Sequence, residues 1–276
     1  MVIGNSEIEQ ETNSNLKLAF YIDSHNFSYI IFNIVKKSFE RIKHIEVDSN
    51  TDSTYKQVEE ILNQEIDLTK KYKKVLGSID ITQSSLIPEP LFDKNNLENY
   101  LDLIAPKKTG WINKYTKQKF TNCYTIFNIE KKLDILLQNQ YPQLNLKPTS
   151  SIFLDYALNI HHAEKIKLFA EINQKNFHII LIENGNLKFY NKFQFESTND
   201  FIYYLMNCIN ILDLKSEKLI LSITTNLEKT NIIFNELKKY IKIRFLKRTP
   251  NFLYKNNVID EPIYKNHNLF SQFICE

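Results

Sequence analysis

The histidines and cysteines are the residues of this chain that best suit metal binding or nucleophilic chemistry. His161 and His162 are adjacent and only Glu164 stands near them, so their side chains point in different directions instead of converging on one ion. The three cysteines lie far apart in the sequence, at Cys123, Cys208 and Cys275. They form no CxxC pair, which excludes zinc-ribbon spacing and a disulfide framework. We therefore expect no metal site and no catalytic residue of these types.

Glycine-dependent chemistry is also poorly supported. The chain contains no Gly-rich P-loop, no GxSxG elbow and no HExxH motif. It has Gly 4 in total, where average usage would give roughly 19. Glycine lets backbone N–H groups approach phosphate oxygens in turn geometries that a Cβ forbids. This scarcity argues against a phosphate-binding enzyme.

Two basic runs with interleaved aromatics, at residues 70–74 and 238–244, suggest nucleic-acid binding. Each run is equally well explained as a solvated helix end that continues into a strand. The net charge is only +3, and the chain has three arginines, the residue type that carries most base and phosphate recognition. We expect no nucleic-acid partner, and a nucleic-acid-associated factor stays as an alternative.

The composition, with 43% hydrophobic, 13% aromatic and 24% charged residues over 276 positions, is that of a folded globular protein. The longest charge-free apolar run, residues 201–212, is shorter than the roughly 18 residues that span a bilayer. The polar opening has no apolar segment of signal-peptide type. These features predict a cytoplasmic protein without membrane insertion.

The order strand-strand-strand-helix-strand occurs twice, over residues 16–80 and 166–224. An offset of 150 aligns Lys17 with Lys167 and Phe27 with Phe177, and an offset of 144 aligns the fourth strands through Ser78 and Ser222. Each unit continues with a helix and a further strand. We expect two related halves that superpose as copies of one motif.

This repeat predicts four parts of the chain. Residues 1–15 form a disordered tail, 16–162 the first half, 163–249 the second half, and 250–276 a C-terminal aromatic extension. Within the first half, a hairpin insertion near 110–128 carries the only tryptophan.

The duplicated unit resembles the ribonuclease-H-like halves of the actin, chaperone-ATPase and sugar-kinase superfamily. The motifs LIPEPLF (residues 86–92) and LKFYNKFQFESTNDFIYYLMN (residues 187–207) are similar to those of an uncharacterised Bacteroidetes family of unknown function with an actin-like ATPase fold. The resemblance covers about residues 16 to 248. It implies an α/β fold of two β-β-β-α-β-α-β halves with a cleft between them, and no established activity.

In active members of that superfamily ATP lies in this cleft, held by two strand-turn-strand phosphate loops and an adenosine turn. The resemblance places the first loop at Asp23-Ser24-His25-Asn26, where the Asp is kept, and the second at residues 173–176, where Asp and glycine are both replaced. The adenosine turn follows Ile223. The degenerate cleft positions are Asp23, Ser24, His25, Asn173, Lys175, Thr224 and Thr225. We expect no nucleotide, no cofactor and no hydrolysis.

Aromatic residues outside the duplicated core are the candidate interaction residues. They are Trp111 in the insertion and Phe252, Tyr254, Tyr264, Phe270 and Phe273 in the C-terminal segment. The segment is too apolar for a free tail, so it either docks on another chain or packs as a strap across the second half. The sequence leaves both open.

Together these features predict a non-catalytic bacterial protein of actin-like fold, a pseudoenzyme that acts as a protein-interaction or scaffold module, by binding a partner or by self-association. One alternative is an enzyme or sensor that still binds ATP, with Asp23 near magnesium and Ser24, His25 and Asn173 at the phosphates. The other is the nucleic-acid-associated factor.

Overall fold

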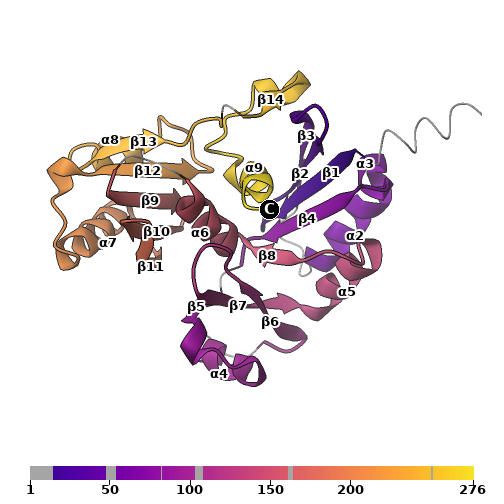
Figure 1. Cartoon of the computed structure of the whole chain (residues 1–276), viewed down its shortest axis with the longest axis horizontal. Helices are drawn as coiled ribbons and strands as arrows, with labels where there is room; N and C mark the ends of the chain where they lie inside the picture. The colour runs from indigo at the N-terminus through magenta and orange to yellow at the C-terminus, as the bar shows by residue number, and fades with distance from the viewer. Residues whose placement is uncertain (1–14, 48–53, 82, 103–107, 161–163, 250) are drawn as a thin grey trace, which may run out of the picture.

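The computed structural model contains two α/β lobes with a smaller sheet attached to the first (Figure 1). The structure describes residues 15–47, 54–81, 83–102, 108–160, 164–249 and 251–276. Residues 1–14 of the expected tail and the pair His161-His162 lie outside these residues. Among the described helices, none is both long enough and apolar enough to cross a membrane.

The first lobe is built on a six-stranded sheet in the order β14-β3-β2-β1-β4-β8. Its strands are β1 (Leu16–Ile22), β2 (Asn26–Asn33), β3 (Ser38–Glu46), β4 (Lys74–Ile79), β8 (Leu146–Pro148) and β14 (Leu253–Tyr254). Its helices are α2 (Thr54–Gln64), α3 (Ile66–Thr69), α5 (Lys131–Gln140) and α6 (Thr149–Asn159).

The second lobe is built on a five-stranded sheet in the order β11-β10-β9-β12-β13. Its strands are β9 (Ile166–Ile172), β10 (Asn176–Glu183), β11 (Asn186–Gln194), β12 (Ile220–Thr225) and β13 (Lys242–Phe245). Its helices are α7 (Thr198–Ile211), α8 (Ile232–Leu237) and α9 (His267–Ile274), with the 3-10 turn η3 (Ser216–Lys218). The 3-10 turn η4 (Asn256–Ile259) packs on β3 of the first sheet.

The two sheets repeat one topology, since β3-β2-β1-β4-β8 corresponds strand by strand to β11-β10-β9-β12-β13. The hairpins share a register as well, because Ile22 pairs with Phe27 and Ile172 pairs with Phe177. The expected two copies of one motif are therefore confirmed in strand order.

The alignment of the fourth strands needs a correction. Tyr21 pairs with Ser78, and its counterpart Glu171 pairs with Thr224, so Ser78 corresponds to Thr224 and not to Ser222. The sequence offset was wrong by two residues. Side chains on a strand alternate between faces, so a two-residue slip keeps every apolar residue on its own face and leaves no trace in the hydrophobic pattern.

Helices pack on both faces of each sheet. The helix on the inner face of each sheet comes from the other lobe. Helices α2 and α5 pack on the outer face of the first sheet, and α7 and α8 on that of the second. Helix α6, from the first lobe, packs Phe153 and Ala157 against Phe169 and Ile180 of the second sheet. Helix α9, from the second lobe, packs Leu269 and other side chains against the first sheet. The two helices lie between the sheets (Figure 1) and contact each other.

The C-terminal segment therefore differs from the extension expected at 250–276. Helix α9 is the next α-helix after β13, as α6 is the next after β8, so it takes the place of the last helix of the second copy, with β14 and η4 inserted before it. The rings of Phe252, Tyr254, Phe270 and Phe273 each lie 4.9 to 5.4 Å from that of Phe39. The segment is a strap, and it packs on the first half instead of across the second.

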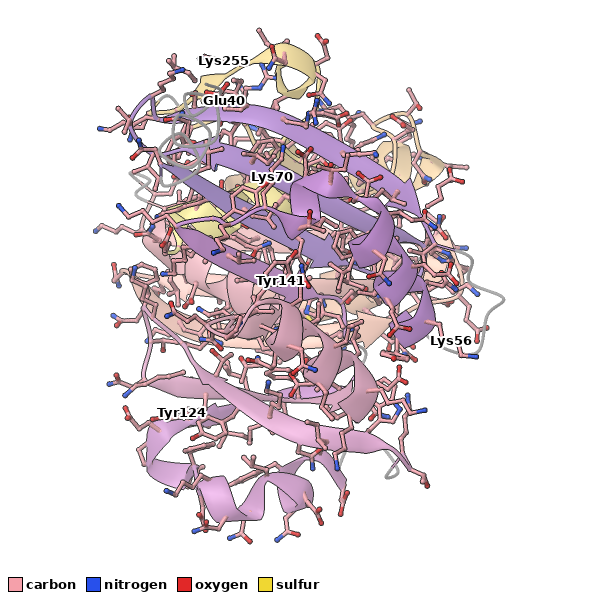
Figure 2. All side chains as sticks on the ribbon, turned by 90° about the vertical axis from the view of Figure 1, so that its right-hand side faces the viewer. Glu40, Lys56, Lys70, Tyr124, Tyr141 and Lys255 are labelled. Atoms are coloured by element: carbon pink, nitrogen blue, oxygen red, sulfur yellow. The ribbon has the colours of Figure 1, made fainter. Side chains whose placement is uncertain are left out.

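The insertion is a separate three-stranded sheet in the order β5-β7-β6 with a short helix. Its elements are β5 (Ser84–Pro88), η1 (Glu89–Leu91), η2 (Lys94–Asn96), α4 (Leu97–Asp102), β6 (Trp111–Lys117) and β7 (Cys123–Glu130). The expected hairpin is β6 and β7, and β5 joins it as a third strand. Figure 2 shows Tyr124 on this sheet, well away from Glu40 and Lys255 at the other end of the molecule.

Candidate functional site

A cavity of about 320 Å³ lies between the lobes, where the ends of β1, β9 and β12 meet the start of α9. Of the predicted cleft residues, Asp23, Asn173, Thr224 and Thr225 line this cavity together. Residues as far apart in the sequence as Asp23 and Thr225 are thus brought to one place by the duplicated topology.

Three other predicted cleft residues lie elsewhere. Ser24 lines a smaller cavity of about 140 Å³ beside Trp111. The side chains of His25 and Lys175 are exposed at the tips of their turns. Thr224 and Thr225 also differ from expectation, because both belong to β12 and only Asn226 follows the strand.

The first turn binds its own backbone donors. The carboxylate of Asp23 accepts hydrogen bonds from the N–H groups of His25 and Asn26, both at 2.7 Å. The Asp23 N–H donates to the Asn26 carbonyl at 2.9 Å, and the equivalent Asn173-to-Asn176 bond has the same length. Neither turn contains a residue with positive φ. Both turns therefore form without glycine.

The C-terminal segment occupies the place expected for adenosine recognition. The Tyr264 carbonyl accepts hydrogen bonds from the Thr224 hydroxyl at 2.7 Å and from the Thr225 N–H at 2.8 Å. Tyr264 itself is buried, and its ring lies 5.1 Å from that of Phe245. This predicted interaction residue is therefore part of the chain's own packing.

Around Glu171 lies a set of interacting ionisable groups, buried or half-buried, that sequence reasoning missed. Glu171 is 3% exposed, and desolvation, opposed by the Asn268 hydrogen bond, raises its carboxyl pKa to about 7. Burial also raises the pKa of Asp80, and Lys192 opposes both shifts through its positive charge. Lys192 belongs to β11 and donates to the Ile81 carbonyl at 3.1 Å, so it joins the lobes. One signal was available: Glu171 is the only acidic residue inside β9.

Burial keeps two further side chains of this region, Tyr21 and His267, in their neutral forms. Desolvation raises the pKa of the Tyr21 hydroxyl, and the negative charges of Asp23, Asp80 and Glu171 raise it further. Desolvation lowers the pKa of His267 to about 3, so its imidazole is neutral at physiological pH. The cavity therefore combines carboxyl groups with neutral polar side chains.

The other residues that the sequence singled out, Trp111 and the two basic runs, lie away from the cavity or in ion pairs. Trp111 is 38% exposed on β6, an edge strand of the insertion sheet, with the Lys108 ammonium 4.6 Å from its ring. The basic runs are partly neutralised. Their ion pairs are Lys70–Asp67, Lys74–Glu276, Lys239–Glu236 and Arg244–Glu164. Among the described residues, no group of three or more His, Cys, Asp or Glu side chains is placed to hold a metal ion.

Two duplicated sheets with exchanged inner helices and a cleft between them define the actin-like ATPase fold. The chain belongs to the family described as Protein of unknown function (DUF3822), whose profile matches residues 5–243. This is a family of the kind that the sequence motifs indicated.

Solved structures show the same fold. A Bacteroides thetaiotaomicron protein with actin-like ATPase fold and unknown function is similar over 97% of this chain and 98% of its own, with 24% identity and a TM-score of 0.80. The PilM-PilN type IV pilus biogenesis complex contains a chain that is similar over 96% of this chain and 99% of its own, with 7% identity and a TM-score of 0.59. None of the curated proteins matches this sequence.

Proposed function

We propose that this protein is a non-catalytic member of the actin-like fold class that acts by binding a partner protein. One observation carries the proposal: oxygens of the chain itself already accept hydrogen bonds from backbone donors of the first turn and of the end of β12. Asp23 holds the N–H groups of His25 and Asn26, and Tyr264 holds that of Thr225. A nucleotide would have to displace these bonds, and its phosphates would then meet the Asp23 carboxylate without a glycine turn to approach.

Melting in the presence of Mg-ATP tests the non-catalytic part. A ligand at 100 times its dissociation constant adds about 2.7 kcal/mol to the free energy of unfolding, which is a readily measured rise in Tm. We expect millimolar Mg-ATP to leave Tm unchanged and phosphate release to stay at the buffer level. A saturable rise in Tm that Asp23→Ala abolishes would replace this proposal with the ATP-binding alternative.

The partner-binding part rests on the insertion sheet. Trp111 and Tyr115, 38% and 43% exposed, lie on the same face of β6, since strand side chains alternate. In the described part of the chain β6 pairs with β7 alone, so its other edge keeps free backbone donors and acceptors. An extended segment of a partner protein, pairing with this edge and contacting the two rings, fits both features. The PilM-PilN complex is a case in which a chain of this fold is part of a protein assembly.

Affinity capture from the native host with matched variants tests this surface. Trp111→Ala should lose a specific protein that the unmodified chain retains. Tyr203→Ala removes an aromatic that is 65% exposed on α7 and should retain it. Equal recovery of every protein by the two variants would reject the β6 edge as the binding surface.

Salt-dependent mobility shifts with DNA and RNA test the nucleic-acid alternative, which the ion pairs of the basic runs disfavour.

A further inference from the structure

The cavity between the lobes is chemically unlike a phosphate site, because its charged side chains are mostly acidic. Asp23, Glu171 and Glu261 line it, and Lys265 is the one lysine among the lining residues. Lys265 forms an ion pair with Glu228, a residue outside the lining. His267 is neutral for the reason given above. The carboxyl groups of the lining outnumber its lysine and therefore favour a cation over an anion, while Lys192 on β11 adds one positive charge near Glu171.

Glu171 is the residue that points to a ligand. Its Oε1 accepts a hydrogen bond from the Asn268 amide at 3.0 Å, but its Oε2 is buried without a hydrogen-bond partner among the described residues. The Asn268 Oδ1 is buried and unpartnered in the same way. Both residues line the cavity. Buried acceptors without donors are costly, about 1–3 kcal/mol each and more when charged.

Three features define what would satisfy these acceptors. The ligand must supply N–H or O–H donors, it must carry positive charge to balance the carboxyl groups, and it must fit about 320 Å³. A metal ion fits less well, because no group of three metal-ligating side chains is placed to hold one in the described residues. A protonated amine or a guanidinium group offers several donors and a positive charge in a small volume.

We propose that this cavity is a binding site for a small organic cation that carries a primary ammonium or guanidinium group, with Glu171 as its counter-charge and Asn268 as a second acceptor. Asp23 and Glu261 add negative charge at longer range. The site goes beyond the partner-binding function and does not depend on it, because the β6 edge is formed by the insertion sheet and the cavity by β1, β9, β12 and α9.

Calorimetry and melting with matched small molecules test this proposal. The probe is 1,4-diaminobutane, and its neutral control of similar size is 1,4-butanediol. We expect a saturable rise in Tm with the diamine and none with the diol. Binding should also release protons near pH 6.5, because a cation favours the ionised form of Glu171. The release is measured as a difference in binding heat between buffers of unequal ionisation enthalpy.

Two variants test whether the diamine binds at Glu171. Glu171→Gln keeps the size of the side chain and its contact with Asn268, and it should weaken diamine binding at least tenfold and abolish the proton release. Glu217→Gln changes an exposed carboxylate in η3, away from the cavity, and should change neither. If Glu171→Gln is poorly folded, Asp23→Asn replaces it, with a smaller loss of affinity expected.

Several results would overturn the proposal. One is no saturable diamine shift in the unmodified protein, and another is unchanged affinity in Glu171→Gln. A shift produced by MgCl₂ or CaCl₂ and lost in that variant would assign the site to a metal ion instead. Binding of Mg-ATP in this cavity would contradict both the proposed function and the premise that the cavity disfavours anions, whereas a failed diamine test without Mg-ATP binding would overturn this proposal alone.

Discussion

Glu171 shows how one side chain links the chemistry of the cleft to stability. Burial desolvates its carboxyl group and the negative charge of Asp80 adds to that effect, and together they outweigh the help that Asn268 and Lys192 give to the ionised form. The folded protein therefore binds a proton at Glu171 more tightly than the unfolded chain does. A lone carboxylate inside an apolar strand is visible in the sequence, but its burial depends on α9 and the other lobe, which no local pattern reveals.

The first prediction concerns the pH dependence of stability. The pKa of Glu171 is about 7 in the folded protein against 4.5 for an ordinary glutamate, so its contribution to the free energy of unfolding falls as pH rises from about 4.5 through 7. Glu171→Gln should remove much of this fall and stabilise the protein at pH 8 by on the order of 3 kcal/mol. Urea unfolding at pH 5 and pH 8 measures the effect, with Glu217→Gln as control. An unchanged pH dependence in Glu171→Gln would contradict the assignment.

Gly77 illustrates a glycine required by close packing. A Cβ built on it would lie 2.6 Å from the Phe20 ring and 3.0 Å from the Leu144 side chain. Both neighbours are buried and cannot move without disturbing the core. Gly77→Ala should therefore lower the free energy of unfolding by about 1–3 kcal/mol, the usual cost of overpacking. Chemical denaturation measures it, and Phe20→Leu combined with Gly77→Ala should recover part of the loss. Full stability of the single variant would show that the ring has room to shift.

At the scale of elements, the strands were predictable and the position of the last helix was not. Runs of β-branched and aromatic residues in β1, β2, β9 and β10, separated by turn-forming residues, predict the two hairpins, and the repeat predicts the two sheets. The aromatics of 252–273 are equally apolar whether they bind another chain or their own. What decides between the two is the inner face of the first sheet, which presents Phe32 and Phe39 to the segment. That face is formed by residues more than 200 positions earlier.

The second half's last helix should therefore be essential to the stability of the first half. Phe270 is 2% exposed, and its ring lies 4.9 Å from that of Phe39. Phe270→Ala should lower the free energy of unfolding by about 3–5 kcal/mol, as for other large core truncations. Tyr203→Ala, on an exposed face, should change it by less than about 0.5 kcal/mol. Equal stability of the two variants would mean that the segment is dispensable and would restore the docking interpretation.

At the scale of the whole molecule, the exchange of α6 and α9 ties the lobes into one structure. Each sheet depends on a helix from the other lobe for its inner face, so neither lobe has a complete core alone. The local repeat in the sequence predicted the two halves, and the resemblance to the actin superfamily implied the cleft between them. It did not predict the exchange, because apolar residues on a helix do not identify the sheet that they cover.

This exchange makes a prediction about cooperativity. Phe153 lies on α6, which follows β8 of the first half, but it is fully buried against Phe169 and Ile180 of the second sheet. Phe153→Ala should therefore reduce hydrogen-exchange protection in β9 and β10, and it should reduce protection in the first sheet as well if the lobes unfold together. Lobes that were independent units would lose protection in one sheet alone, and calorimetry would then resolve two transitions in place of one. We expect a single transition with a lowered midpoint, because removing the Phe153 ring also loosens the contact between α6 and α9 on which the first sheet depends.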